Sequence, residues 1–145
     1  MELNNAIIDC ATDVYNELGS GWTEVIYQKA MEVSFRESGI EYDNLRTVTI
    51  SYKSHIIGDA QIDLLPYVVA KDGIKQYIVV ELKAVAKLEE GYKTQAIKYV
   101  NELKAQCKPD EVIAGAILIN FCNEGKNKKL NNDVQDVNGL QLLTL

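Results

Sequence analysis

The chain has 145 residues, which is long enough for one domain with a substantial core and short for two. Hydrophobic residues make up 47% of it and charged residues 25%, a balance typical of globular proteins that excludes a disordered or membrane-embedded chain. The formal net charge of −6 argues against a protein that coats nucleic acid nonspecifically, although it is compatible with a local basic groove. We therefore expect one continuous domain over residues 1–145.

No segment has the pattern of a membrane span or of a secretory signal. The longest apolar runs fall well short of the roughly twenty residues that are needed to cross a bilayer. The N-terminus carries Glu2 and has no basic region ahead of an apolar segment. We expect a cytoplasmic protein that has no membrane partner.

The cysteines indicate neither a metal centre nor a disulfide framework. Cys10, Cys107 and Cys122 form no CxxC pair, and His55 is the single histidine. A zinc or iron–sulfur site needs several such ligands at short spacing. Reduced and buried thiols are therefore the favoured interpretation of all three cysteines.

Two helices are predicted at the start of the chain. Apolar residues at helical spacing predict a helix over residues 4–18, and Gly19 follows where a C-terminal cap would stand. The next segment predicts a second helix, with Ser20 or Thr23 as its N-cap and Gly39 as its stop.

The hydrophobic period then changes to that of β-strands. Val48, Ile50 and Tyr52 alternate with polar residues, which predicts a half-buried strand. A second strand is expected over residues 56–70, and the turn KDG leads into a third over residues 74–84. A three-stranded meander is the simplest arrangement of these segments.

The last part of the chain returns to helix and then to strand. Apolar residues from Leu88 to Leu103 are expected on one face of a helix that Pro109 ends. The run EVIAGAILINF is typical of a strand covered on both faces, and the final GLQLLTL predicts a short last strand. Together these elements predict an α/β fold with a mixed central sheet flanked by helices.

Charged residues on the second and third strands form a candidate site. Asp63 lies near the middle of the second strand, and Glu81 and Lys83 share one face at the end of the third. Carboxylates on adjacent strands suit a hard divalent cation, and a lysine beside them could orient water or neutralise charge on a phosphate. Taken alone, these three residues are explained more simply by an ion pair at a strand end, worth about 0–1 kcal/mol if exposed.

Lysines could line a groove for nucleic acid beside this site. They recur between Lys83 and Lys108, and again at Lys126, Lys128 and Lys129. Phosphate contacts depend on a few placed cations, so such a rim is compatible with an acidic chain. Solvated surface lysines explain each position equally well, and both interpretations stay open.

The order of several short motifs resembles a known family. The segment GWTEVIY places Gly21, Glu24 and Tyr27 at the three positions of the GxxExxY pattern, which names a family in the PD-(D/E)XK nuclease superfamily. Further motifs follow in the family's order: IDLL with Asp63, VVELKAV with Glu81 and Lys83, TQAIKYV with Gln95, and LINF at residues 118–121. The resemblance extends from about residue 4 to residue 121, and its specificity comes from the order of the motifs.

The resemblance implies a restriction-endonuclease-like core with a defined active site. It makes Asp63 and Glu81 the ligands of Mg²⁺, for which Mn²⁺ could substitute, and Lys83 the catalytic lysine. Glu24 would be an accessory acidic residue, and Gln95 would help to hold a ligand, water or phosphate. Simpler explanations stay open, because the helix dipole favours any carboxylate at Glu24 and Gln95 could be a solvated helix residue.

Three further positions bear on this resemblance. Tyr27 is expected to be a packing residue whose hydroxyl finds a partner. Gly21 is expected to serve the backbone ahead of the second helix. Tyr92 stands where relatives commonly have a histidine, so the resemblance assigns no proton-transfer role at that position.

Two functional hypotheses follow. In the first, the protein is a Mg²⁺-dependent nuclease that hydrolyses phosphodiester bonds of nucleic acid, with DNA as the favoured substrate. In the second, the nuclease-like fold is catalytically silent and binds nucleic acid or a protein partner. A homodimer would allow two small sites to engage both strands of a duplex. The sequence does not indicate whether the substrate is DNA or RNA, or whether it is single-stranded or double-stranded.

Overall fold

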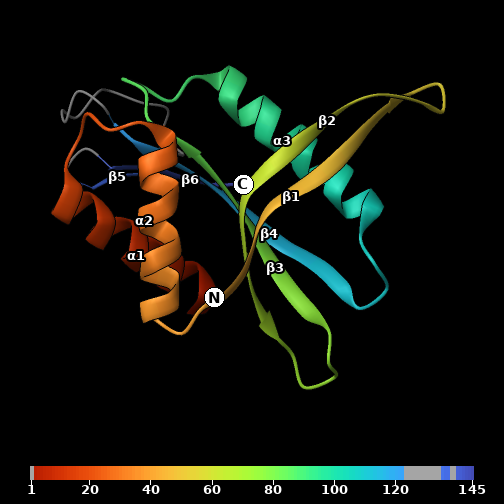
Figure 1. Cartoon of the computed structure of the whole chain (residues 1–145), viewed down its shortest axis with the longest axis horizontal. Helices are drawn as coiled ribbons and strands as arrows, with labels where there is room; N and C mark the ends of the chain where they lie inside the picture. Colours follow the sequence, from red (N-terminus) through yellow and green to blue (C-terminus); the bar gives the residue numbers. More distant parts are fainter. Residues whose placement is uncertain (1, 123–134, 138–139) are drawn as a thin grey trace.

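The chain is organised around one mixed β-sheet. A computed structural model describes residues 2–122, 135–137 and 140–145 (Figure 1). The described elements are α1 (Glu2–Leu18), α2 (Glu24–Glu37), β1 (Glu41–Tyr52), β2 (His55–Val69), β3 (Lys75–Lys83), α3 (Glu90–Gln106), β4 (Glu111–Phe121), β5 (Gln135–Val137) and β6 (Leu140–Thr144). Across the sheet the strands lie in the order β1-β2-β3-β4-β6-β5.

Strands β1, β2 and β3 form the predicted antiparallel meander. A two-residue turn joins β1 to β2, and both of its residues, Lys53 and Ser54, have positive φ angles of 49° and 65°. This conformation matches the twist of a hairpin. β2 pairs with β3 in a register that sets Leu64 opposite Val80. That register decides which side chains meet at the end of β3.

Strand β4 makes the sheet mixed. It pairs in parallel with β3, and α3 provides the crossover between the two strands. Parallel neighbours need such a connection because the chain must return to the end of the sheet from which it started. β6 then pairs antiparallel with β4, and β5 with β6. The expected mixed sheet flanked by helices is therefore confirmed.

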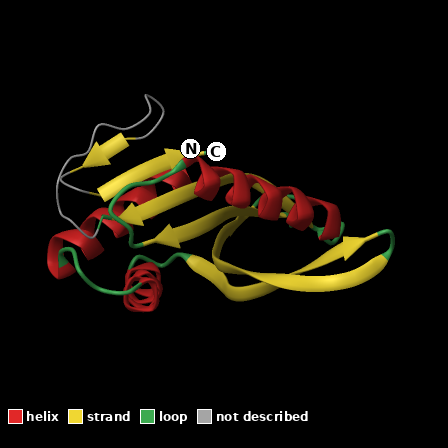
Figure 2. Ribbon diagram, turned by 90° about the horizontal axis from the view of Figure 1, so that it is seen from above, coloured by secondary structure: helices red, strands yellow, loops and turns green. Residues whose placement is uncertain are grey.

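The helices cover opposite faces of the sheet. α1 and α2 lie on one face and α3 on the other (Figures 1 and 2). On β3, Val80 and Leu82 pack in the cluster that contains α1 and α2, whereas Tyr77 and Val79 pack with α3. Because side chains alternate along a strand, Glu81 belongs to the face covered by α3.

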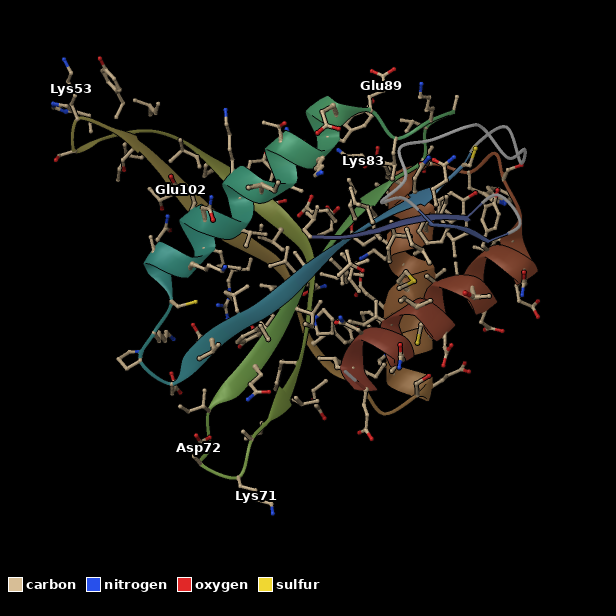
Figure 3. The ribbon with its side chains drawn as sticks, turned by 180° about the vertical axis from the view of Figure 1, so that it is seen from behind. Lys53, Lys71, Asp72, Lys83, Glu89 and Glu102 are labelled. Atoms are coloured by element: carbon tan, nitrogen blue, oxygen red, sulfur yellow. The ribbon has the colours of Figure 1, made fainter. Side chains whose placement is uncertain are left out.

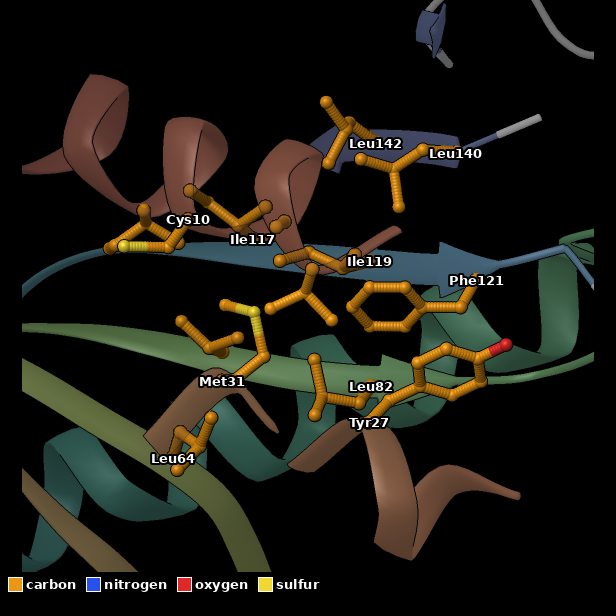
Figure 4. Close-up of a cluster of buried hydrophobic side chains, with 14 of the residues drawn as sticks. Cys10, Tyr27, Met31, Leu64, Leu82, Ile117, Ile119, Phe121, Leu140 and Leu142 are labelled. Carbon is orange, nitrogen blue, oxygen red and sulfur yellow. The ribbon is translucent and has the colours of Figure 1, made fainter. Parts of the chain in front are cut away.

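The larger core lies between the sheet and helices α1 and α2. Tyr27 from α2 stacks on Phe121 of β4, with ring centroids 4.3 Å apart and an interplanar angle of 2° (Figure 4). Met31, Leu82 and Ile119 pack around this pair and are buried. Burial of each large side chain contributes about 1.5–3 kcal/mol, so this cluster fixes α2 against the sheet.

The turn between α1 and α2 depends on glycine. Gly19 has a φ of +69° and donates its N–H to the carbonyl of Tyr15 at 2.8 Å, as expected of a C-terminal cap. Gly21 has a φ of +102°, which few other residues adopt. Thr23 is the N-cap residue of α2, and its side chain makes no capping hydrogen bond. The predicted backbone role of Gly21 is confirmed.

Two expectations about apolar residues were wrong. Leu88 lies before α3 rather than on its apolar face, and it packs with Leu118 and Leu143. The first half of β4 is not covered on both faces, since Val112 is 46% exposed. Helices α1 and α2 pack only over the second half of that strand, from Ile117 onward.

Other expectations concern single positions. Cys10 and Cys122 are buried as predicted, whereas Cys107 is only half-buried just beyond α3. The possible lysine rim at residues 126–129 lies outside the described residues. Every helix in the described part of the chain falls short of the length or apolar character that crossing a bilayer requires.

The β1–β2 hairpin projects beyond the rest of the sheet (Figures 1 and 2). Tyr52, Ile56 and Ile57 near its tip are more than half exposed. On β1, three residues before the strand ends, the N–H of Thr49 donates a hydrogen bond to the Gln106 side chain at 3.1 Å, and that side chain donates one to the Thr49 carbonyl at 2.8 Å. The end of α3 therefore holds the edge strand in place.

Tyr27→Phe is expected to lower the free energy of unfolding by about 1–3 kcal/mol. The Tyr27 hydroxyl donates to the carbonyl of Gly19 at 2.6 Å and accepts from the N–H of Trp22 at 3.4 Å, so its loss leaves both groups without this partner. Urea denaturation followed by circular dichroism measures the change. Tyr52→Phe, at a 59% exposed position, is the matched control and should leave stability unchanged. Equal stabilities of the two variants would contradict this account.

Candidate active site

Two carboxylates meet where β2 and β3 run side by side. The pairing of β2 with β3 runs from Leu64 opposite Val80 to Val69 opposite Lys75, and Asp63 and Glu81 come just beyond its last pair. Glu81 is hydrogen-bonded to the Asp63 backbone, and the two carboxylates interact electrostatically. Asp63 and Glu81 therefore lie close together near the end of β3.

Glu81 is the most strongly perturbed acid of this cluster. It is only 6% exposed, and its pKa is raised from 4.5 to about 8, chiefly by burial. Repulsion from Asp63 and Glu24 contributes to this rise, while a hydrogen bond with the Asp63 backbone and attraction to Lys83 oppose it. In the protein alone, Glu81 therefore carries a proton through the neutral range.

Asp63 is half-buried and is held by the neighbouring strand. Its Oδ2 accepts a hydrogen bond from the backbone N–H of Leu82 at 2.8 Å. Burial raises the pKa of Asp63, whereas the Leu82 hydrogen bond and attraction to Lys83 lower it. The side chain of Gln28 on α2 donates to the Asp63 carbonyl at 3.3 Å. These contacts fix the carboxylate to β3 and the backbone to α2.

Lys83 supplies the positive charge of the cluster. Its Nζ lies 5.1 Å from the centre of the Tyr92 ring, at the start of α3. Its attraction lowers the pKa of Asp63, Glu81 and Glu24 alike. Figure 3 places Lys83 at the end of the sheet opposite the β2–β3 turn with its labelled residues Lys71 and Asp72. One cation therefore interacts with all three acids.

Glu24 approaches the cluster from α2. It is the first residue of that helix, and α2 begins at the same end of the molecule where β3 ends (Figure 1). Burial raises the pKa of Glu24, attraction to Lys83 lowers it, and repulsion from Asp63 raises it. Glu24 thus interacts electrostatically with the strand residues, although its side chain is more exposed than theirs.

Gln95 is not joined to the carboxylates by a hydrogen bond within the described residues. It is exposed on α3, one turn beyond Tyr92, which contacts Lys83. Residues three apart on a helix lie on the same side, so Gln95 is near the rim of the site rather than inside it. Its predicted role in holding water or phosphate stays a prediction.

The donor set fits a divalent cation that keeps part of its water. Oε1 of Glu81 is buried and has no hydrogen-bond partner within the described residues. Such an orphaned carboxylate oxygen is costly unless a cation or water satisfies it. No group of three or more acidic, histidine or cysteine side chains forms a closed metal cage in the described chain. Mg²⁺ commonly uses one or two carboxylates with waters, which matches Asp63 and Glu81.

One family model matches residues 1–132 of the chain, and it describes the PD-(D/E)XK nuclease superfamily. The chain belongs to the PD-(D/E)XK nuclease superfamily. The match includes all the candidate site residues, and the α/β fold with a mixed sheet and three helices agrees with this superfamily. The narrower GxxExxY family stays a prediction. Comparisons with curated proteins and with solved structures find no match.

Sequence reasoning missed two buried polar residues, Asn120 and Gln141, that support the candidate site. Asn120, paired with Lys83 across β3 and β4, accepts a hydrogen bond from the N–H of Val85 at 2.9 Å and donates to its carbonyl at 3.0 Å. It also donates to Oε1 of Gln141 at 2.8 Å, and that oxygen accepts from the Leu88 N–H at 3.3 Å. The pair therefore holds the segment that follows Lys83.

A signal for Asn120 was present in the sequence. It is a polar residue inside the apolar run AILINF, and a fully buried amide must find partners. The partners themselves could not be predicted, because Gln141 lies on a strand twenty-one residues further along the chain. Cys122 adds a contact of the same kind, donating its S–H to the Ala86 carbonyl at 3.1 Å.

Glu81→Gln is expected to make the metal-free protein more stable than the native one at pH 8.5, and equally stable near pH 4.5. The pKa of Glu81 is raised by folding, so its contribution to stability is full below 4.5 and is lost as pH rises through about 8. The difference should exceed about 1 kcal/mol, the free energy of one pKa unit. Urea denaturation in EDTA across this range measures it.

Glu37→Gln, at an exposed position at the end of α2, is the control for this pH series. It should follow the native protein at every pH. A Glu81→Gln variant that also follows the native protein would show that the Glu81 carboxylate is not destabilised by its surroundings.

Proposed function

We propose that this protein is a divalent-metal-dependent nuclease that hydrolyses phosphodiester bonds of nucleic acid, with DNA as its substrate. The observation that carries the proposal is the cluster of two interacting carboxylates, Asp63 and Glu81, with Lys83 acting on both. Membership of a nuclease superfamily supports the reaction class.

In this proposal, Asp63 and Glu81 hold the cation. Mg²⁺, or Mn²⁺ in its place, supplies Lewis-acid polarisation of the phosphate when bound. Glu81 must lose its proton to act as a ligand, because a ligating carboxylate is ionised. Lys83 and the cation both favour that ionised form, so the burial that raises the pKa of Glu81 couples cation binding to proton release.

Lys83 is the residue that acts on the phosphate. An ammonium placed on the face of the two carboxylates can neutralise negative charge that develops as the phosphodiester is attacked. The Tyr92 ring beneath its Nζ restricts where that ammonium lies. Glu24 would receive a proton or orient water from the opposite side, and Gln95 would contact the substrate at the rim.

Lys83→Ala is expected to reduce metal-dependent cleavage by at least about 100-fold, the usual cost of removing one group that stabilises transition-state charge. The assay uses plasmid, linear duplex, single-stranded and branched DNA, and RNA, each with Mg²⁺ or Mn²⁺. Lys71→Ala, in the exposed β2–β3 turn at the far end of the sheet, is the matched control (Figure 3).

Cleavage by the native protein and by Lys71→Ala, lost in Lys83→Ala, is the expected result. If no substrate is cut by the folded native protein, the proposal fails, and the alternative of a catalytically silent module that binds nucleic acid or a protein partner takes its place.

Cation binding should raise the melting temperature of the native protein, and the rise should be larger at pH 8.5 than at pH 6. At a cation concentration of about 100 times Kd the stabilisation is about 2.7 kcal/mol. Protons compete with the cation for Glu81, which explains the expected dependence on pH.

Asp63→Asn should abolish this stabilisation by Mg²⁺ or Mn²⁺. Asp59→Asn, at an exposed position on the same strand, should retain it. An equal shift in both variants would show that the cation binds elsewhere.

A further inference from the structure

Trp22 is the single tryptophan of the chain, and its side chain is conspicuously exposed. It lies in the turn between α1 and α2, where 51% of its surface is accessible to solvent. Val25 and Ile26, in the first turn of α2, are 61% and 43% exposed. A group of exposed apolar side chains marks a candidate binding surface.

The indole is fixed in place although its ring is open to solvent. Its Nε1 donates a hydrogen bond to the Leu18 carbonyl at 3.0 Å, and its backbone N–H donates to the Tyr27 hydroxyl at 3.4 Å. Tyr27 is itself stacked on Phe121 in the core. The polar edge of the indole is thus satisfied by the protein, so what remains for a ligand is apolar aromatic surface.

Trp22 lies beside the candidate active site. It precedes Glu24 by two residues, so the two Cα atoms can be no more than about 7 Å apart. Glu24 interacts electrostatically with Asp63 and Lys83, so the start of α2, directly after the turn, lies near the carboxylate cluster. A nucleic acid strand whose phosphate reaches Lys83 would therefore pass the indole.

We infer that Trp22 stacks against an unpaired base next to the phosphate bound at Lys83, so that the substrate class is single-stranded or locally unpaired nucleic acid. This inference rests on the proposed nuclease function. An exposed aromatic ring stacks on a base without regard to sequence, because every base has a flat π face. In a duplex that face is already covered by neighbouring bases, and exposing it costs free energy.

The charge of the protein favours the same substrate class. Binding to duplex DNA depends chiefly on many lysine and arginine contacts with phosphates. With a net charge of −6 and an acidic cluster at its centre, this chain provides little general attraction for a duplex. Stacking on Trp22 supplies an attraction that does not depend on net charge.

The test uses Trp22 as its own reporter. Native protein in EDTA is titrated with a single-stranded DNA oligonucleotide, with a blunt duplex of the same sequence, and with an abasic strand of the same length. The single strand should quench the tryptophan fluorescence with saturation, the duplex should do so far less, and the abasic strand should not. No cleavage is needed for this measurement.

Variants then test the contribution of the ring to affinity. By anisotropy of a labelled single strand, Trp22→Ala should bind about tenfold more weakly, and Trp22→Phe should keep most of the affinity. Tyr52→Ala, at an exposed aromatic position on the hairpin, is the control and should bind like the native protein. Circular dichroism melts verify that each variant is folded, and Trp22→Phe retains a ring in case Trp22→Ala does not fold.

The outcomes separate this inference from the proposed function. Single-strand binding with unchanged fluorescence, or equal quenching by duplex and single strand, overturns the stacking role while leaving the nuclease proposal intact. Absence of any binding overturns the inference as well. Specific quenching by the single strand without cleavage by any metal-loaded sample upholds stacking while the nuclease proposal fails.

Discussion

The burial of two neighbouring carboxylates is the constraint on which the site depends. Asp63 and Glu81 lie close together near the end of β3, where burial opposes ionisation of both. Lys83 offsets only part of this cost, and the buried Glu81 oxygen has no hydrogen-bond partner among the described residues. Without a cation, the cost of burying the charge favours the protonated form of Glu81. A cation bound by both acids would lower that cost and favour their ionised forms.

Contacts in the rest of the fold hold the two carboxylates near each other. The Leu82 N–H holds the Asp63 carboxylate, and the buried face of α2 is locked to β4 by the stacked rings of Tyr27 and Phe121. On the other side, Asn120 holds the segment after Lys83 through the backbone of Val85. Because these supports come from helices and strands on both faces, the acids cannot separate without disturbing the packed core.

The sequence was informative wherever local pattern determines structure. Alternation and helical spacing predicted the order of the elements apart from β5, including the meander that carries Asp63 and Glu81 on neighbouring strands. It failed where distant segments decide the outcome. Its spacing from Ala96 and Leu103 put Leu88 on a helix face. Leu88 is instead buried against Leu143, and the sequence gives no sign of a contact so far along the chain. The raised pKa of Glu81 could not be foreseen either, since a strand end gives no measure of its solvent exposure.

Strand β6 is part of the sheet, although it lies beyond the residues that match the family model. The match ends at residue 132, yet Gln141 on β6 accepts hydrogen bonds from Asn120 and from the Leu88 backbone. A fragment cut at residue 132 would keep every candidate catalytic side chain and lose Gln141, which accepts hydrogen bonds from Asn120 and from the Leu88 backbone. It would also uncover apolar surface on β4. Loss of activity in such a fragment would therefore reflect the missing strand β6 and would give no information on the chemistry of the acids.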